Sequence, residues 1–397
     1  MKVVSILPLL IIALIADAQP GSHGDWLVTP IKQRAEISLS SSKKDIILFN
    51  GLVKRTFRIT PNVACTGYEN IVTGQQLLRS VKPEARVTIN NKEYNIGGLN
   101  GQKENGYLLR EWIDNFSSGS DDFVLDSYTI DSITPFLKWK QHSYAPGIKR
   151  ASGKTVSFVY KSPVRELNNI VVSVHYEIYD GIPLIVKWLT IENGSPNVVT
   201  INRVVNEVLG LVEEESAVVG SVSQMEKQQG IYVETNYAFN NAMNYEISDQ
   251  TTHWKADSTY TSQVNYNFQT PCLLEIYPEK VTAVKVAPGD QFNSVRSYEL
   301  LMDSYDRVRR GLIKKKMYRA VAPWTNQNPI FMHLVSRNDD EVRRAIDQCA
   351  ATGYEAVILS FGSHLDMEDS SEANLSKWNA LAVYAHSKKI LIGGYSL

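Results

Sequence analysis

Residues 169–193, NIVVSVHYEIYDGIPLIVKWLTIEN, decide the fold of most of the chain because they contain two strand patterns and the turn between them. Every second side chain of the first half is apolar or aromatic: Val172, Val174, Tyr176 and Ile178. A period of two is typical of a strand that buries one face. Asp180-Gly181 is a tight-turn dipeptide, and apolar residues resume after it. The stretch therefore predicts an antiparallel hairpin.

Similar patterns are found on both sides of this hairpin. Residues 45–59 predict two short strands around Asn50-Gly51, and residues 85–96 predict another hairpin around Asn90-Asn91. Further strands are expected within residues 198–212, 230–237 and 280–292. No amphipathic helical pattern interrupts residues 36–285. Many short strands separated by regular turns predict a large antiparallel β-sandwich.

The pattern changes at Ser294. Apolar and aromatic residues now recur at helical spacing: Tyr298, Leu301, Met302, Tyr305, Val308 and Leu312. We expect a connecting helical segment over residues 294–323, ended by Pro323. Basic residues lie along it: Arg307, Arg309, Arg310, Lys314, Lys315, Lys316 and Arg319. Because the whole chain has a net charge of −1, these residues indicate a solvated helix face and not a nucleic-acid surface.

The last part of the chain reads as alternating strands and helices. Residues 329–336 form a continuous apolar run, which predicts a parallel strand buried on both faces. Asn338 and Glu341 predict the start of a helix, and Gly353 predicts its end. The expected buried stripes are Val342, Ala345, Ile346 and Cys349 on this helix, and Leu375, Trp378, Ala382 and Ala385 on the next. Residues 355–362 and 388–397 complete a strand–helix–strand–helix–strand unit.

The N-terminus has the features of a secretory signal. Lys2 precedes an apolar run from Val3 to Ile15, and a small-x-small ending follows at Ala16-Asp17-Ala18. We expect a signal peptide over residues 1–18, and a secreted protein, or a periplasmic one in a bacterium. An uncleaved anchor is the alternative. After cleavage no later segment is apolar enough to span a membrane, so no membrane partner is expected.

Cysteine and motif content limits the chemistry. The three cysteines leave at least one thiol unpaired; Cys349 reads as a small buried hydrophobe, and pairing of Cys65 with Cys272 is left open. The sequence contains no CxxC, HExxH or paired histidines at ligand spacing, so neither a metal nor a cofactor is expected. Asn115 and Asn374 are each the first residue of an Asn-x-Ser tripeptide and are candidate glycosylation sites.

Four stretches carry a resemblance to a known family. They are FNGLVKRTFRITPN (49–62), NPIFMHLV (328–335), GYEAVILSFGS (353–363) and AHSKKILIGGYSL (385–397). Together with the order of elements, they resemble the α-galactosidase (melibiase) group of retaining glycoside hydrolases. The resemblance implies a galactose-mutarotase-like β-supersandwich over residues 19–293, a connecting segment over 294–323, and the first part of a (β/α)₈ (TIM) barrel over 324–397. It also implies a carbohydrate substrate.

The chain departs from this family at the catalytic positions. Where the family carries an Asp pair followed by Gly-Trp, this chain has Ser-Phe-Gly-Ser at 360–363. The family's nucleophile lies on the fourth barrel strand and its acid/base on the sixth, whereas three strands cannot close a barrel of eight. The catalytic carboxylates are therefore expected beyond Leu397, and we expect the chain as given to be inactive. The resemblance does not carry over the sugar.

Candidate substrate-binding residues follow the three predicted parallel strands, because active sites on barrels lie at the carboxyl ends of the strands. They are His333, His364, Asp366, Glu368, Asp369 and Tyr395. Each has an ordinary alternative: a solvated loop histidine, acidic residues that favour a helix N-terminus, or an aromatic packed on a sheet. None is given a catalytic role.

Two functional classes remain open. In the first, the chain is the N-terminal portion of a secreted, α-galactosidase-like retaining glycoside hydrolase. In the second, it is a non-enzymatic carbohydrate-binding or structural β-sandwich protein with a vestigial barrel. The sequence does not indicate an oligomeric state.

Overall fold

The structure, a computed structural model, describes residues 24–103, 107–139, 151–214, 227–237, 249–257, 272–279, 282–326 and 328–394. The expected signal peptide at 1–18 and the candidate Tyr395 lie outside these residues, and both stay predictions. Within the described ranges no helix is both long and apolar enough to cross a membrane.

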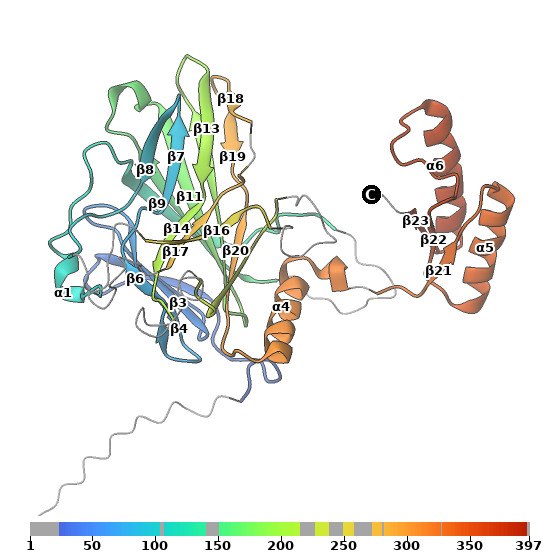
Figure 1. The fold of residues 1–397 in the computed structure, drawn as a ribbon, viewed down its shortest axis with the longest axis horizontal. Coiled ribbons are helices and arrows are strands. Elements are labelled where there is room, and N and C mark those ends of the chain that lie inside the picture. Colours follow the sequence, from blue (N-terminus) through green and yellow to red (C-terminus); the bar gives the residue numbers. More distant parts are fainter. Residues whose placement is uncertain are drawn as a thin grey trace, which may run out of the picture.

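Antiparallel sheets form the larger part of the molecule (Figure 1). One sheet has the order β1-β2-β3-β4-β5, with strands Glu36–Leu39, Asp45–Phe49, Val53–Arg58, Ala64–Asn70 and Gln75–Gln76. The largest has the order β15-β20-β12-β11-β10-β9, with strands Ile231–Thr235, Ser297–Leu301, Leu184–Asn193, Ile170–Tyr179, Gly153–Lys161 and Val124–Ser132. β19 (Gln291–Asn293) also pairs with β12.

Two smaller sheets complete the antiparallel part. One has the order β18-β13-β7-β8, with strands Val284–Val286, Val199–Val205, Ala85–Ile89 and Lys92–Ile96. The other has the order β16-β17-β14-β6, with strands Thr252–Ala256, Cys272–Ile276, Glu207–Leu211 and Leu78–Ser80. Two short helical turns interrupt the strands, α1 (Arg110–Ile113) and η1 (Arg165–Leu167). The predicted sandwich class is thereby confirmed, because one buried apolar cluster joins side chains from all four sheets.

The hairpin at the centre of the largest sheet is the one predicted from residues 169–193. β11 and β12 pair antiparallel from Ile170 opposite Asn193 to Ile178 opposite Ile185. Gly181 turns the chain at a φ of +68°, a backbone conformation that favours glycine. The alternating residues of β11 are all buried in the sandwich core: Val172, Val174, Tyr176 and Ile178. The two-residue alternation and the Asp180-Gly181 turn are sufficient to predict this hairpin, because the side chains that they place in the core are the ones that are buried.

The connecting helix begins later than predicted. Residues Ser297–Leu301 form β20, which pairs with β12 on one side and with β15 on the other. α4 runs from Arg307 to Val321, and the Asp306 side chain caps it by accepting from the Arg309 N–H at 2.7 Å. The predicted helix over the first part of 294–323 is therefore wrong. Hydrogen bonds to two neighbouring strands outweigh the helical spacing of Tyr298, Leu301 and Met302.

The end of the chain forms a smaller α/β unit, which Figure 1 shows apart from the sandwich. The parallel strands are β21 (Phe331–Leu334), β22 (Ala356–Leu359) and β23 (Leu391–Gly394), in that order. The helices are α5 (Asp339–Thr352) and α6 (Glu372–Ser387), and the turn η2 (Pro323–Asn326) precedes the unit. Asn338 caps α5 and Gly353 ends it at a φ of +82°, as predicted. The fold class is confirmed as a β-sandwich, a connecting helix and part of an α/β fold; closure of a barrel stays a prediction.

Two burial predictions in this unit are wrong. β21 is half exposed, with Phe331 46% exposed, because in the described chain it lies at a sheet edge with one neighbour, β22. On α6 Leu375 is 58% exposed, and Leu381 takes the buried place beside Ala385. The buried stripe of α5 is as predicted: Val342, Ala345, Ile346 and Cys349.

The three cysteines form no disulfide with one another. Cys65, Cys272 and Cys349 are all buried. Burial raises the pKa of Cys65 to about 12. The possible Cys65–Cys272 bond is absent from the structure, and the expectation for Cys349 is confirmed.

Candidate functional site

The structure ties His364 to the start of α5. Its Nδ1 lies 2.9 Å from the Ser336 carbonyl oxygen, and its Nε2 lies 2.6 Å from Oδ1 of Asp339. The ring also packs against Trp378, with 5.3 Å between ring centres. Both ring nitrogens thus hold the loop after β22 against the loop after β21. These contacts give His364 a structural role. The residue nevertheless follows the carboxyl end of β22, where the sequence analysis placed it.

The acidic residues of the same loop are occupied by backbone contacts. Oδ1 of Asp366 accepts from the N–H groups of Glu368 and Asp369, at 2.9 and 3.2 Å. Oδ1 of Asp369 accepts from the N–H of Ser371 at 2.8 Å, a bond that lowers the pKa of Asp369. Ser371 in turn caps α6. The carboxylates therefore shape the turn into a helix, which is the alternative reading given above.

The remaining sequence candidates that the structure describes are His333, Asn115 and Asn374. His333 is an exposed residue of β21, opposite Ile358 of β22. Asn115 is exposed and suited to modification. The Asn374 amide is engaged: it donates to the carbonyl oxygens of Asp366 and Asp369, and it accepts from Nε1 of Trp378 at 2.9 Å. In the described ranges no three His, Cys, Asp or Glu side chains are grouped so as to hold a metal ion.

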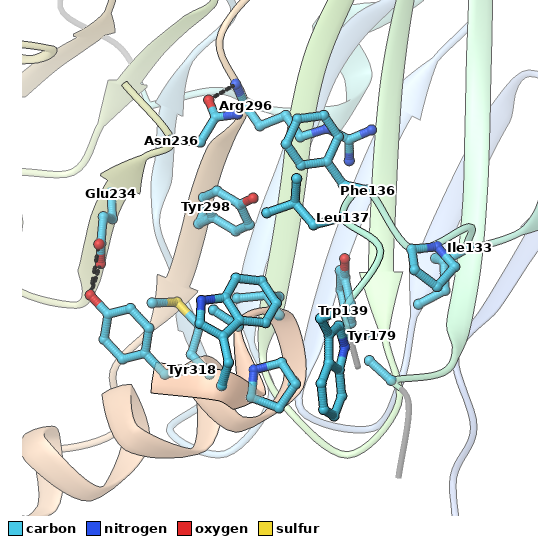
Figure 2. Close-up of a pocket in the computed structure, with 18 of the residues that line it drawn as sticks. Ile133, Phe136, Leu137, Trp139, Tyr179, Glu234, Asn236, Arg296, Tyr298 and Tyr318 are labelled. Atoms are coloured by element: carbon cyan, nitrogen blue, oxygen red, sulfur yellow. Dashed lines mark hydrogen bonds between the residues drawn. The ribbon is translucent and has the colours of Figure 1, made fainter. Parts of the chain in front are cut away.

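A more distinctive site lies between the sandwich and α4. It is a cavity of about 210 Å³ that draws on the loop after β9, on β15 and β20, on α4 and on η2. Figure 2 shows its side chains converging on one hollow. The lining includes Ile133, Phe136, Leu137, Trp139, Tyr179, Glu234, Asn236, Arg296, Tyr298, Tyr318 and Trp324. We call this site the junction cavity.

Aromatic side chains supply much of the cavity wall. Trp139, from the loop after β9, and Trp324, from η2, lie 6.3 Å apart between ring centres, with 52° between their planes. Tyr298 of β20 and Tyr318 of α4 add two phenol rings (Figure 2). Burial raises the pKa of Tyr298 to about 12, so its hydroxyl stays a neutral donor at ordinary pH. These rings offer flat apolar faces with hydroxyls at their edges.

Three polar residues in or next to the neighbouring strands β15 and β20 line the same cavity: Glu234, Asn236 and Arg296. The Tyr318 hydroxyl lies 2.6 Å from both carboxylate oxygens of Glu234, which share its one proton, and one of these oxygens also accepts from the Tyr232 hydroxyl at 2.9 Å. Asn236 and Arg296 hold each other through the backbone: the Arg296 N–H donates to Oδ1 of Asn236 at 2.8 Å, and the Asn236 N–H donates to the Arg296 carbonyl at 3.1 Å.

The Arg296 side chain lies in a stack of rings. Its guanidinium carbon lies 3.6 Å from the ring centre of Trp188 and 4.4 Å from that of Phe136. Trp188 stacks in turn on His175 at 4.6 Å. Burial, with the charge of Arg296, lowers the pKa of His175 to about 4, so this ring is neutral at ordinary pH.

An N-terminal segment holds α4, and hence one cavity wall, against the sandwich. Arg309 of α4 makes two contacts with Asp25, at 2.9 and 3.0 Å, and two with Asp303, both at 2.7 Å. Nε1 of Trp26 also donates to Asp303 at 2.7 Å. The buried Trp26 ring belongs to the apolar cluster that contains Ile313 and Met317 of α4. We call these contacts the N-terminal clasp.

Sequence reasoning did not find the junction cavity. Its polar residues come from strands far apart in sequence, and Tyr298 was assigned to a helix. The available signals were the abundance of Tyr and Trp and the Pro323-Trp324 pair at the end of the helical pattern. Neither signal gives a location until β20 is known to lie beside β15.

Comparison with known proteins gives matches in structure alone. No family model matches the chain, and no curated protein matches it. An α-galactosidase from Geobacillus stearothermophilus, solved in complex with raffinose, is similar with a TM-score of 0.49 and 11% identity, over 88% of this chain and 56% of that one. An α-galactosidase from Lactobacillus brevis has a TM-score of 0.45 and 11% identity, over 91% and 54%. A glycoside hydrolase family 97 enzyme from a Pseudoalteromonas strain has a TM-score of 0.37 and 9% identity, over 90% and 53%.

The chain thus spans about half the length of the solved structures that it resembles. Two of the three are α-galactosidases. The likeness concerns overall architecture, and no residue's role is transferred through it.

Proposed function

We propose that this chain is the N-terminal portion of a secreted, α-galactosidase-like retaining glycoside hydrolase, and that it recognises carbohydrate through the junction cavity. The observation that carries the proposal is the combination of aromatic walls with polar side chains in one small hollow. The resemblance of four stretches to the α-galactosidase group supports the reaction class: residues 49–62, 328–335, 353–363 and 385–397.

The cavity chemistry suits a sugar ring. Pyranose rings present apolar C–H faces and a rim of hydroxyls, and the aromatic faces of Trp139, Trp324 and Tyr298 match the first of these. The Asn236 amide and the Arg296 guanidinium offer polar groups for the second. A volume of about 210 Å³ is below the range of drug-sized pockets, roughly 300–1,000 Å³, and suits one ring better than a long oligosaccharide.

The catalytic pair of this proposal lies outside the described residues. Retaining hydrolysis needs two carboxyl groups about 5–5.5 Å apart, on opposite sides of the scissile bond. Asp366 and Asp369 belong to one loop and are occupied by backbone N–H groups. We therefore place the nucleophile and the acid/base on barrel strands beyond Leu397.

A second candidate function is a non-enzymatic carbohydrate-binding protein. The bonding of His364 to Asp339 and of Asp366 to its own loop favours it, because these rim residues then serve the fold. The junction cavity would serve this function equally well.

One pair of assays tests these proposals. Calorimetric titration of the purified chain with galactose, glucose and their methyl glycosides, at millimolar concentrations, measures recognition. A panel of aryl glycosides measures hydrolysis. The enzyme proposal expects saccharide binding without turnover by this chain, and turnover once the coding frame beyond Leu397 is included. Binding without turnover by the extended protein would favour the second candidate, and a chain that binds no saccharide would refute both.

Export is tested separately. Mass spectrometry of protein from the culture medium or periplasm is expected to find Gln19 at the N-terminus. An intact Met1 on soluble protein from the cytosol would refute secretion without affecting the carbohydrate proposal.

A further inference from the structure

Among the described residues that line the junction cavity, Arg296 is the cationic side chain. Its backbone is fixed by the reciprocal bonds with Asn236, and its guanidinium packs against the rings of Trp188 and Phe136. A guanidinium held in this way is oriented before any ligand arrives, so little conformational freedom is lost when it binds.

The charge of Arg296 is less completely paired than that of the comparable arginines. Arg55 contacts two carboxylates at 2.8 and 2.9 Å, and Arg309 contacts two carboxylates at 2.7 to 3.0 Å. In the described part of the chain, Arg296 contacts one carboxylate, Glu177, at 3.5 Å and through Nη1 alone. This is the upper limit of a hydrogen-bond distance.

Glu177 is also shared with another donor. Its Oε2 accepts from the Tyr179 hydroxyl at 2.8 Å as well as from Arg296. Burial raises the pKa of Glu177. Within the described ranges, Nε and Nη2 of Arg296 donate to no side chain. The two nitrogens are also not among the buried polar atoms that lack a hydrogen-bond partner. These donors therefore remain available to a ligand.

A carboxylate on the neighbouring strand, that of Glu234, lines the same cavity. Glu234 accepts from the hydroxyls of Tyr318 and Tyr232, and these bonds orient its carboxylate before a ligand arrives. The Arg296 fork and the Asn236 amide nitrogen are hydrogen-bond donors in this cavity. A planar fork of N–H donors matches the two oxygens of a carboxylate.

We propose that the junction cavity selects an acidic sugar, a uronic acid residue whose carboxylate pairs with Arg296 while its ring packs on the aromatic wall. This inference rests on the proposed carbohydrate recognition and adds the charge of the ligand to it. A neutral hexose keeps the ring contact but lacks the group that completes the pairing of Arg296.

The test is a calorimetric titration of the full chain with glucuronate and galacturonate, and with glucose and galactose as neutral partners of the same ring shape. Two variants separate charge from geometry: Arg296→Gln removes the charge, and Arg296→Lys keeps the charge but removes the fork. Arg319→Gln, an exposed arginine of the cavity-bearing helix, is the matched control. Circular dichroism establishes that each variant is folded.

We expect both uronates to bind at least tenfold more tightly than the neutral sugars, and this preference to weaken as salt is raised. Arg296→Gln should remove the preference, Arg296→Lys should retain part of it, and Arg319→Gln should leave it unchanged. Equal binding of acidic and neutral sugars, or a preference that survives Arg296→Gln, would overturn the inference and leave the proposed function standing. Failure of every sugar to bind would overturn both.

Discussion

Arg55 donates from Nη1 to Oε2 of Glu299 at 2.8 Å, and both side chains are fully enclosed inside the sandwich. Nη2 of the same arginine donates to Glu207 at 2.9 Å, and Lys187 donates to the other oxygen of Glu207 at 2.8 Å. The Glu84 carboxylate, which accepts from the Tyr176 hydroxyl, adds a third acid to these two cations. The charges of this group of three acids and two cations cancel when one of the acids keeps its proton.

Glu299 is the acid that keeps the proton. Burial, together with the neighbouring charge of Glu207, raises the pKa of Glu299 to about 8. Burial also acts against ionised Glu207, but the charges of Arg55 and Lys187 outweigh it and hold the pKa of Glu207 below its usual range. The core therefore contains one neutral and one ionised glutamate on the same arginine.

This difference predicts the effect of Glu299→Gln. The folded chain holds the Glu299 proton up to about pH 8, whereas the unfolded chain releases it near the ordinary pKa of 4.5, so its contribution to stability falls as pH rises between these values. Gln is a neutral mimic of the protonated acid. From pH 5 to pH 8 the stability of the variant relative to the native protein should rise by roughly 2 kcal/mol or more.

Urea unfolding at intervals between pH 5 and pH 9 makes this measurement. Glu69→Gln is the control, because it removes a half-exposed partner of Lys54. It should change the stability by the same amount at pH 5 and at pH 9. If the stability difference between Glu299→Gln and the native protein stays constant with pH, Glu299 is ionised in the fold and the assignment is wrong.

The N-terminal clasp predicts a coupling between Trp26 and the junction cavity. Trp26→Ala removes a buried ring that packs with Ile313 and Met317 of α4, and should destabilise the sandwich by roughly 3–5 kcal/mol. Because α4 also carries Tyr318, the variant should bind saccharide more weakly even at temperatures where it is folded. Val308→Ala, at a site 70% exposed on the same helix, should change neither quantity. If folded Trp26→Ala binds sugar as tightly as the native protein, the N-terminal clasp does not influence binding in the junction cavity.

The α/β unit should exchange its amide hydrogens faster than the sandwich. In the described chain β21 and β23 each have one neighbouring strand, and His333 of β21 is exposed. In contrast, β11 lies between β10 and β12 with its core-facing residues fully buried. Hydrogen exchange followed by mass spectrometry should show early labelling of residues 328–394 and late labelling of β11. Equally slow labelling of both would show that the unit is stable by itself or is covered by a partner.

Glycosylation should distinguish Asn115 from Asn374 in a host that modifies secreted proteins. Asn115 is exposed, whereas the Asn374 amide holds the turn before α6 through Asp366 and Asp369 and also contacts Trp378. Peptide mapping should find a glycan on Asn115 and none on Asn374. Asn374→Gln should lower thermal stability, while Asn115→Gln should not. A glycan on every Asn374 side chain in folded protein would contradict the hydrogen bonds described for this residue.

The sequence predicted those elements whose determinants are local. Alternation in residues 169–193 and the Asp180-Gly181 turn suffice for β11 and β12, and Asn338 with Gly353 suffices for α5. Arg55 shows the limit of this reasoning. Alternation along β3 does place it on the inward face, but a charged residue is buried there because Glu207 and Glu299 come from distant strands.

The candidate site was less predictable than the fold. The rim residues were located at strand ends, but their hydrogen bonds to Asp339 and to backbone N–H groups depend on the folded loops. The junction cavity requires that β20 pair with β15 and that η2 bring Trp324 near Trp139. Both are tertiary contacts, and no spacing along the chain encodes them.

The central claim, that the junction cavity binds carbohydrate, is tested most directly by Trp324→Ala. Saccharide titration should show about a tenfold loss of affinity, since the variant removes one aromatic face of the cavity. Phe331→Ala, which truncates an exposed ring on the parallel sheet, should bind as the native protein does. If folded Trp324→Ala keeps full affinity for a saccharide that the native chain binds, the sugar is held elsewhere and the account is contradicted.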